Sequence, residues 1–413
     1  MKDKFKIINS CQISGDKNLK KIISLGNLPS VNSAFDIKSG IKPELFFPAD
    51  LYYSTKSKMA QLNCIVDKKI LFPKSYPYTS STTKILRDNF NDLAKEIFSI
   101  LKIQDHELIL DIGSNDGNLL SNFKQKMKVL GITPENIGKL AIKKGIPTIL
   151  NYFDKHSVKL ILKNYGKARI VTATNVFAHI ENTDELISNI KKCLSKNGVF
   201  ITESHYLPKL IDDVQYDTVY HEHLRYYSLL SLDFLFKKHG LEIFHAKKIK
   251  THGGSIRVYC SYKNTYKKNK SVNAILKQEK LQLTSKRFLQ FAKKVQDSKT
   301  SLWNILSKLK KQNKKIAGIS APSRASTLIN YVGLDQGILE CVFEIKGSHK
   351  IGKFIPGTNI PILVESFNNL KKFDYLIIFS WHIFKQIKEN LKRNGYKGRL
   401  ICPLPIPKLY KIT

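Results

Sequence analysis

Residues 108–117 read Leu-Ile-Leu-Asp-Ile-Gly-Ser-Asn-Asp-Gly, and this stretch decides the fold. Its first five residues form an apolar run of strand length, and its glycines permit a tight turn before a helix that we predict from about Asn118. The spacing D-x-G-x-x-x-G differs from the phosphate-binding G-x-G-x-x-G pattern and carries no P-loop lysine. The stretch predicts a buried strand, a glycine turn and a helix, and the alternative is a plain connection without a ligand.

Further apolar runs on both sides of this stretch predict two sheets. The runs lack the alternation of a half-exposed strand and are separated by helical segments, which favours parallel strands covered on both faces. We predict strands at 129–132, 170–173 and 199–202 in the first sheet and at 316–319, 341–343, 375–379 and 400–402 in the second. The fold class is therefore α/β, with a second, smaller doubly wound unit near the C-terminus.

The remaining segments predict three domains. The beginning of the chain consists of short apolar runs interrupted by Gly, Pro, Ser and Asn, which is typical of a small irregular module. Helical spacing of apolar residues predicts a helix over 84–101 and one or two connecting helices over 271–310. We expect domain limits at 1–83, 84–262 and 263–413.

The composition favours a soluble protein. The 413 residues are 42% hydrophobic and carry a formal net charge of +36. Most of the cations are lysines spread along the chain, so we interpret them as solvated surface residues and expect no nucleic-acid partner. No apolar run of spanning length and no signal peptide is visible, so we expect a cytoplasmic protein that makes no membrane contact. The six cysteines form no C-x-x-C pair, which favours reduced, buried thiols.

The segment Tyr220-His221-Glu222-His223 is a candidate for catalysis. Imidazole titrates near neutral pH, a carboxylate orients such a base, and a phenol donates to a developing oxyanion. The two-residue spacing of the histidines differs from the four-residue spacing of a helical zinc pair. A polar surface segment is the alternative. His179 adds an imidazole after a predicted strand, at the sheet edge where ligands bind.

Two turns are candidate anion sites. The segment 252–257, His-Gly-Gly-Ser-Ile-Arg, brings backbone amides and a guanidinium together, although a turn at the start of a strand is the alternative. The segment 318–325 contains Arg324 in a strand-to-helix turn, and the N-terminus of that helix is suited to a phosphate.

The glycine turn resembles motif I of class I S-adenosylmethionine (SAM) methyltransferases. The resemblance implies SAM as the cofactor. The residues expected to hold it are Asp111, Gly113, Asn115, Asp116, Gly117, Asn136 and Asn175. The strand after the turn usually ends in an acidic residue that binds the ribose hydroxyls. Here Thr133 takes that place, and Glu135 or Asn136 is expected to serve instead.

Over essentially its whole length, the chain resembles the sugar C-methyltransferases of deoxysugar biosynthesis, which methylate C3 of nucleotide-linked 4-keto sugars. Besides the glycine turn, the resemblance rests on 25–32 (Leu-Gly-Asn-Leu-Pro-Ser-Val-Asn), 76–81 (Tyr-Pro-Tyr-Thr-Ser-Ser), 175–179 (Asn-Val-Phe-Ala-His), 220–223, 252–255, 321–322, 353–358 and 403–405. The combination of 220–223 with 252–255 is its most specific part.

The resemblance also implies roles. His223 would be the base, Glu222 its neighbour, and Tyr220, His179 and Tyr78 the other catalytic residues. The residues expected to bind substrate are Tyr76, His221, His252, Gly253, Ser255, Arg257, Arg324 and Lys353. The base would remove the C3 proton, which the keto group acidifies, and a tyrosine or histidine would stabilise the enolate. An unperturbed histidine pKa of about 6.5 suits this task.

The implied fold has a small zinc-binding module, a SAM-binding Rossmann-like domain and a C-terminal Rossmann-like domain that contributes to nucleotide-sugar binding. The module usually holds zinc by two C-x-x-C pairs, which here read Cys-Gln-Ile-Ser at 11–14 and Ser-Thr-Lys-Ser at 54–57. Only Cys11 keeps its thiol, and hydroxyls are poor zinc ligands, so we expect no metal. We further expect a dTDP-linked sugar as substrate and a monomer or weak dimer.

Two other functions remain as alternatives. A sugar O-methyltransferase would use the same base but would not exchange a carbon-bound proton with solvent. An RNA-binding protein or an inactive relic is the other alternative. The chain shows no basic patch interleaved with aromatic residues, and its 220–223 segment is complete, which argues against both.

Overall fold

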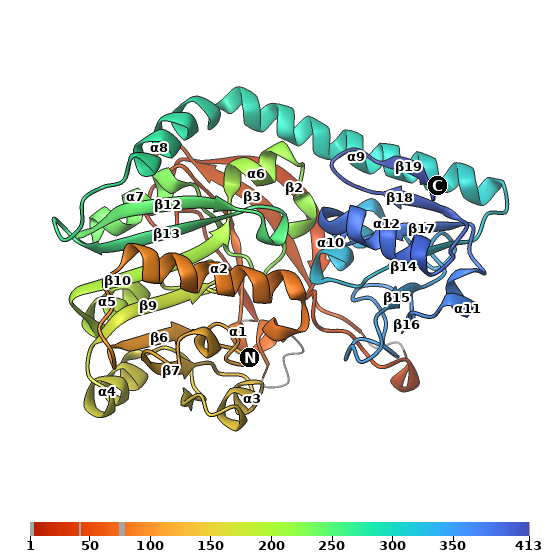
Figure 1. Ribbon diagram of the computed structural model, residues 1–413. Coiled ribbons are helices and arrows are strands. Elements are labelled where there is room, and N and C mark those ends of the chain that lie inside the picture. The colour runs from red at the N-terminus through yellow and green to blue at the C-terminus, as the bar shows by residue number, and fades with distance from the viewer. Residues whose placement is uncertain (1–3, 41–42, 74–78, 413) are drawn as a thin grey trace.

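The computed structural model describes residues 4–40, 43–73 and 79–412 (Figure 1). Its centre is a seven-stranded sheet of order β12-β13-β10-β9-β6-β7-β8. The strands from β10 to β8 in this order run parallel, and β13 is antiparallel to both of its neighbours. The bounds are β6 Leu108–Ile112, β7 Lys128–Ile132, β8 Thr148–Ile149, β9 Ala168–Thr174, β10 Leu194–His205, β12 Leu241–Ile249 and β13 Ser255–Tyr262. The predicted α/β fold is confirmed.

Helices cover both faces of this sheet because its strands are apolar on both sides. On one face, Leu93 and Ile97 of α2 pack in one cluster with Ile109 and Ile201. Figure 1 shows α2 crossing that face. The other face is covered by α4, α5 and α7. The bounds are α2 Lys84–Ile100, α3 Gly138–Lys143, α4 Lys155–Asn164, α5 Thr183–Cys193, α6 Leu207–Asp212 and α7 Leu229–Lys238.

The N-terminal part forms an antiparallel sheet of order β11-β4-β3-β2. One edge strand of this sheet, β11, comes from far along the chain: its residue Arg225 pairs with Gln61 of β4. The 220–223 segment is therefore tied to the N-terminal sheet by the strand that follows it. The bounds are β1 Phe5–Ile7, β2 Leu19–Pro29, β3 Phe46–Ser54, β4 Met59–Leu62, β5 Cys64–Val66, α1 Lys68–Leu71 and β11 Arg225–Tyr226.

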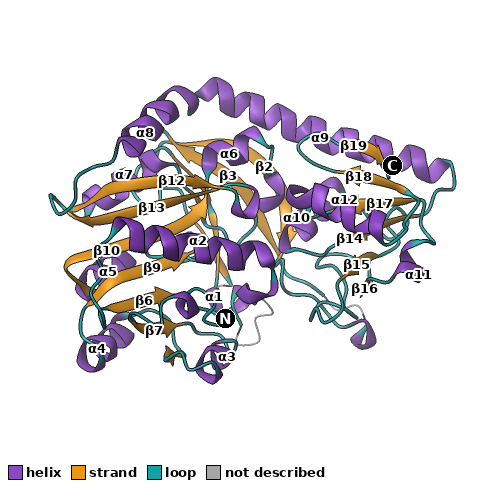
Figure 2. Ribbon diagram, in the orientation of Figure 1, coloured by secondary structure: helices purple, strands orange, loops and turns teal. Residues whose placement is uncertain are grey.

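The C-terminal part is a six-stranded sheet of order β16-β15-β14-β17-β18-β19 (Figure 2). All its pairs are parallel except that of β18 with β19, as a doubly wound unit with one added edge strand requires. The bounds are β14 Ile316–Ile319, α10 Ser323–Val332, β15 Val342–Glu344, β16 Ile362–Val364, α11 Phe367–Leu370, β17 Tyr375–Ile378, α12 Phe384–Arg393, β18 Arg399–Cys402 and β19 Lys408–Lys411. The predicted second sheet is confirmed.

Two helices connect the sheets: α8 (Lys270–Gln282) and the long α9 (Ser285–Lys311). Figure 1 shows α9 running along one side of the molecule from α8 toward the C-terminal sheet. α8 packs on β12 and α7, although the sequence places residue 263 onward in the third domain, so the domain limits stay a prediction. Within the described ranges, no helix is long and apolar enough to cross a membrane.

Candidate active site

The candidate site lies at the carboxyl edge of the seven-stranded sheet. The glycine turn follows β6 there, Asn175 follows β9, and His205 is the last residue of β10. Neighbouring parallel strands end at the same edge, which is where open α/β sheets bind their ligands. The sheet thus brings together residues that lie up to about 90 positions apart.

The turn after β6 has a backbone shape that suits a closely approaching ligand. Gly113, Asn115 and Gly117 have φ values of 73°, 51° and 77°, in the left-handed region. A Cβ atom at Gly113 would lie 2.3 Å from Cγ2 of Val176, so this position requires glycine. The turn therefore fits the adenosyl part of SAM, which the backbone must approach closely.

A serine from the 76–81 segment lies against this turn. The backbone N–H of Ser80 donates to Asn115 Oδ1 at 2.9 Å, and its hydroxyl donates to the Asp116 carboxylate at 2.5 Å. Burial favours the protonated form of Asp116, but bonds from Ser80 and Lys144 outweigh it and lower the pKa of this carboxyl. The predicted site residues Tyr76 and Tyr78 lie outside the described residues.

The structure shows the surroundings of two expected cofactor ligands, Asp111 at the start of the motif and the residues that follow β7. Asp111 is buried and accepts a hydrogen bond of 2.6 Å from the Thr172 hydroxyl, and burial raises its pKa to about 7. Its carboxyl group therefore joins β6 to β9, and its expected contact with the cofactor stays a prediction. After β7, the Thr133 hydroxyl donates to the Glu135 carboxylate, and the role of Glu135 at the ribose stays a prediction. Asn136 is exposed, and its role stays a prediction.

Four histidine rings meet beside this edge. The ring centroids of His179 and His223 are 5.1 Å apart, those of His205 and His223 4.7 Å, and those of His205 and His252 5.9 Å. Tyr220 packs on His223 at 4.2 Å. Of the predicted residues, the structure brings His179, Tyr220, His223 and His252 together. We call the four histidines the imidazole cluster.

His223 is held in one tautomer. Its Nδ1 atom lies 2.9 Å from the carbonyl oxygen of Thr218, which only accepts hydrogen bonds, so Nδ1 carries the proton and Nε2 carries the lone pair. Burial lowers the pKa of His223 well below 6.5, and the neighbouring His205 and His179 lower it further. The expected unperturbed pKa is therefore wrong, because water does not solvate the charged ring. The ring is neutral at neutral pH.

Sequence reasoning missed His205. It directly follows Thr-Glu-Ser at the end of a predicted strand, and that position at the ligand-binding edge was the available signal. Burial lowers its pKa well below the ordinary value as well.

Two neighbours of His223 point elsewhere. His221 Nε2 lies 3.0 Å from the carbonyl oxygen of Pro48, and its ring packs edge-on against Phe47. His221 is therefore a buried structural residue and not the expected substrate ligand. The Glu222 carboxylate accepts a hydrogen bond of 2.6 Å from Asn32 of the N-terminal part. Residues 220–223 form a turn, closed by a hydrogen bond of 2.9 Å from the His223 N–H to the Tyr220 carbonyl, so the side chains of sequence neighbours point in different directions.

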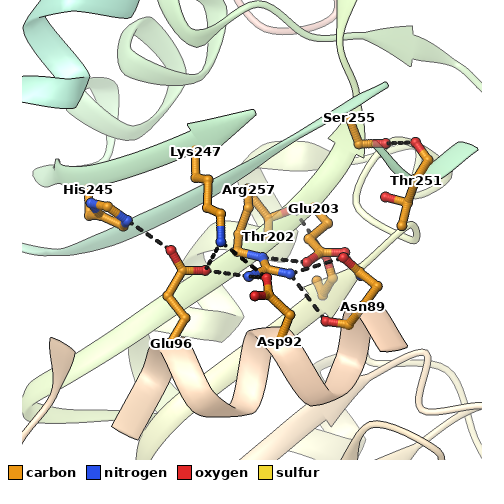
Figure 3. A network of polar contacts seen from close by, with 11 residues as sticks. Asn89, Asp92, Glu96, Thr202, Glu203, His245, Lys247, Thr251, Ser255 and Arg257 are labelled. Carbon is orange, nitrogen blue, oxygen red and sulfur yellow. Dashed lines mark hydrogen bonds and ion pairs between the residues drawn. The ribbon is translucent and has the colours of Figure 1, made fainter. Parts of the chain in front are cut away.

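Arg257 also lies away from the cluster, inside the network of Figure 3. Its guanidinium is fully buried and binds the carboxylates of Glu203, Glu96 and Asp92 and the side chain of Asn89. Hydrogen bonds from His245 and Arg257 lower the pKa of Glu96 to about 2 against the effect of its burial. The expectation that Arg257 binds substrate is wrong, because its hydrogen-bond donors are already used to hold α2 on the sheet.

The turn at 251–255 is held by its own bonds. The Ser255 hydroxyl donates to the Thr251 carbonyl at 3.1 Å, and the Gly253 carbonyl accepts from Gln215 at 2.7 Å. His252 has a φ of 54°, and this backbone conformation turns its ring toward His205. Ser255 is therefore a structural residue, whereas His252 belongs to the cluster.

The C-terminal part adds Arg324 to the site. Its guanidinium donates to the His252 carbonyl at 3.1 Å and stacks over Trp381 with 5.5 Å to the ring centroid. The sequence predicts a phosphate at the start of α10. There the backbone N–H of Ala321 already donates to the Glu344 carboxylate at 2.8 Å, and this negative charge would repel a phosphate. Lys353 lines a small cavity between the N-terminal and C-terminal parts, apart from the imidazole cluster.

The positions of the two degenerate C-x-x-C pairs lie together. Cys11 Sγ is 3.2 Å from Ser57 Oγ, and Ser54 Oγ accepts from the backbone N–H of Ser57 at 3.3 Å. Burial favours the neutral thiol, but bonds from Ser14 and Ser57 lower the pKa of Cys11. In the described ranges, no group of three His, Cys, Asp or Glu residues is arranged to hold a metal ion. The expectation of no zinc stays a prediction.

Comparisons with known proteins match both large parts of the chain. Residues 82–246 match the family model "Methyltransferase domain", and residues 250–405 match "C-methyltransferase C-terminal domain". The protein "C-methyltransferase NovU" of Streptomyces niveus is 27% identical over 417 residues, which cover 99% of this chain and 98% of that protein.

Two solved structures resemble part of the chain. Magnesium protoporphyrin IX methyltransferase of Synechocystis with bound SAM is 14% identical and covers 43% of this chain and 79% of its own, with a TM-score of 0.32. A SAM-dependent methyltransferase of Anabaena variabilis is 16% identical. The match covers 46% of this chain and 89% of that protein, with a TM-score of 0.35.

Proposed function

We propose that this chain, a SAM-dependent methyltransferase, transfers a methyl group to a carbon atom of a nucleotide-linked keto sugar, with C3 of a 4-keto-6-deoxyhexose as the expected acceptor. The observation that carries the proposal is the fixed His223 ring, which packs against His205 at the sheet edge that also carries the glycine turn. Methylation of a carbon atom next to a keto group requires a base that removes the proton from its C–H bond. The C-methyltransferase descriptions of the matching model and relative support a carbon acceptor.

In the proposed reaction, Nε2 of His223 takes the proton from the carbon next to the keto group. The electron pair of the broken C–H bond forms the enolate double bond, and the carbonyl pair moves onto oxygen. A positioned general base contributes about 10²–10⁴-fold to such a step. When bound, SAM supplies an electrophilic methyl group. Tyr220 and His179 pack on His223 and are proposed to line the sugar site.

The cofactor is proposed to lie on the turn 113–117, with Glu135 or Asn136 at its ribose and Asn175 beside it. The division into domains at 83 and 262, a dTDP-linked substrate, a cytoplasmic location and a monomeric or weakly dimeric state all stay proposals. The basic surface, with a net charge of +36, favours an anionic substrate of this kind.

The test is incubation of the protein with SAM and a panel of nucleotide-linked 4-keto-6-deoxysugars, analysed by mass spectrometry. We expect a mass gain of one methyl group, and exchange of the neighbouring C–H for deuterium in D₂O. A methylated product without any exchange would favour O-methylation instead. A protein that binds SAM but methylates no keto sugar contradicts the proposal.

A further inference from the structure

His205 has no role in any of the sequence motifs, yet it touches the proposed base. Among the rings around His223, two are inclined to it by smaller angles: Tyr220 by 33° and His179 by 29°. Two are perpendicular: Tyr226 at 89° and 6.1 Å, and His205 at 88° and 4.7 Å. Of the two perpendicular rings, only that of Tyr226 belongs to a residue that shares a hydrogen-bond acceptor with His223 among the bonds of the described residues.

Tyr226 identifies the Nδ1 edge. Its hydroxyl donates at 2.8 Å to the carbonyl oxygen of Thr218, the same oxygen that accepts from Nδ1 of His223. Because Tyr226 and Thr218 take up the Nδ1 side, we infer that His205 lies on the side of Nε2, where the lone pair is. A group bound to that lone pair would lie next to the His205 ring.

The surroundings of His205 keep its ring neutral and leave its nitrogens available. Burial, His252, Arg324, His179 and His382, in this order, lower its pKa. Within the described ranges, the structure gives its side chain ring contacts but no hydrogen bond. A neutral imidazole always carries one N–H donor. His205 therefore presents a donor beside the proposed base that no described protein group accepts.

We propose that His205 is a catalytic residue that contacts the substrate and donates its N–H to the carbonyl oxygen that becomes negative in the reaction. This inference rests on the proposed function. As the C–H bond breaks, the proton bonds to Nε2 of His223, the electron pair forms the carbon–carbon double bond, and the carbonyl pair moves to oxygen. His205 keeps its own proton and stabilises that oxygen by a hydrogen bond, an effect that typically gives about 10²–10³-fold in kcat.

The test compares three variants with the wild-type protein. His205→Phe keeps a ring of similar size without a donor, and His205→Gln keeps an N–H donor of similar reach. His239→Phe is the matched control, because this histidine pairs with Asp184 at the end of α7. For each, kcat and KM for the keto sugar, deuterium exchange at its carbon and SAM affinity by calorimetry are measured.

We expect His205→Phe to lower kcat and the exchange rate by about 10²–10³-fold, with SAM affinity and KM changed by less than about threefold. The Gln variant should recover part of this loss, which a purely structural role would not predict. If the wild type is active and both His205 variants keep its kcat and exchange rate, the inference is wrong but the proposed function stands. If the wild type binds SAM but neither methylates nor exchanges any keto sugar, both are wrong.

Discussion

The indole N–H of Trp381 donates to the carboxylate of Asp217 at 2.8 Å, across 164 positions of the chain. Asp217 directly precedes Thr218, whose carbonyl holds the proposed base His223. Trp381 belongs to the C-terminal part and also stacks on Arg324. The orientation of the base therefore depends on contacts from a part of the chain that carries no proposed base of its own.

Trp381→Phe tests this link. Trp381 is 8% exposed and Asp217 1% exposed, so removal of the donor leaves a buried carboxylate short of a partner. Such a loss costs about 1–3 kcal/mol of unfolding free energy, and we expect lower kcat because His223 loses its support. Urea unfolding and steady-state kinetics are the measurements. Trp303→Phe on α9, where the ring is 39% exposed, is the control; equal effects of both variants would contradict the link.

Gly113→Val should abolish SAM binding. The new Cβ would overlap Val176, and a φ of 73° is unfavourable for a β-branched residue. Isothermal calorimetry measures the affinity. Gly145→Ala is the matched control, because Gly145 has a φ of 75° but nothing within 4 Å of its Cβ position. SAM affinity that survives in the Gly113 variant would show that the turn does not hold the cofactor.

His223→Ala should lower methyl transfer by about 10²–10⁴-fold while SAM affinity stays within about twofold. His223 lies in the loop before β11 and the glycine turn follows β6, so loss of the ring should leave the proposed cofactor site in place. Deuterium exchange at the substrate carbon separates proton removal from methyl transfer. Exchange at the wild-type rate in this variant would move the role of base to His179 or Tyr78.

Acid should destabilise the protein as pH falls from about 6.5 toward 4. Burial lowers the pKa of His179 and of His252 to about 4, and it lowers the pKa of His205 and His223 well below 6.5. In this range the unfolded chain binds protons that the folded chain does not, so stability is lost as pH falls. Thermal unfolding between pH 7.5 and 4.5 measures the effect.

The control for this pH dependence is His252→Gln, which removes one of the buried titrating groups. We expect its melting temperature to fall less steeply with decreasing pH than that of the wild type. The prediction is contradicted if the melting temperature of the wild-type protein stays constant across this pH range. Protonation of the imidazole cluster would then not lower the stability of the folded protein.

Purified protein should contain no stoichiometric zinc. Three of the four positions at 11, 14, 54 and 57 carry hydroxyls, which bind zinc poorly. Elemental analysis is the measurement, and one tightly held zinc per chain would contradict the prediction. The positive control is a variant with Ser14→Cys, Ser54→Cys and Ser57→Cys, which should bind one zinc ion because these positions lie close to Cys11.

The sequence alone determined the fold class and the shape of the glycine turn. Residues 108–112 and 316–319 form strands at those bounds, because short apolar runs without alternation, bounded by turn residues, fit the buried strands of a sheet covered on both faces. The glycines at 113 and 117 have the left-handed backbone that the motif predicts. Local sequence suffices for such features, since hydrophobic periodicity and backbone sterics act over a few residues.

Only the tertiary structure decided which polar residues meet. His221 and His223 are two positions apart, yet one binds Pro48 and the other joins the cluster with His179 and His205. The guanidinium of Arg257, five positions from His252, instead binds the buried carboxylate of Glu203. Side-chain direction, burial and the pairing of buried charges depend on elements far apart in the chain. For that reason the lowered pKa of His223 and the place of His205 could not be read from the sequence.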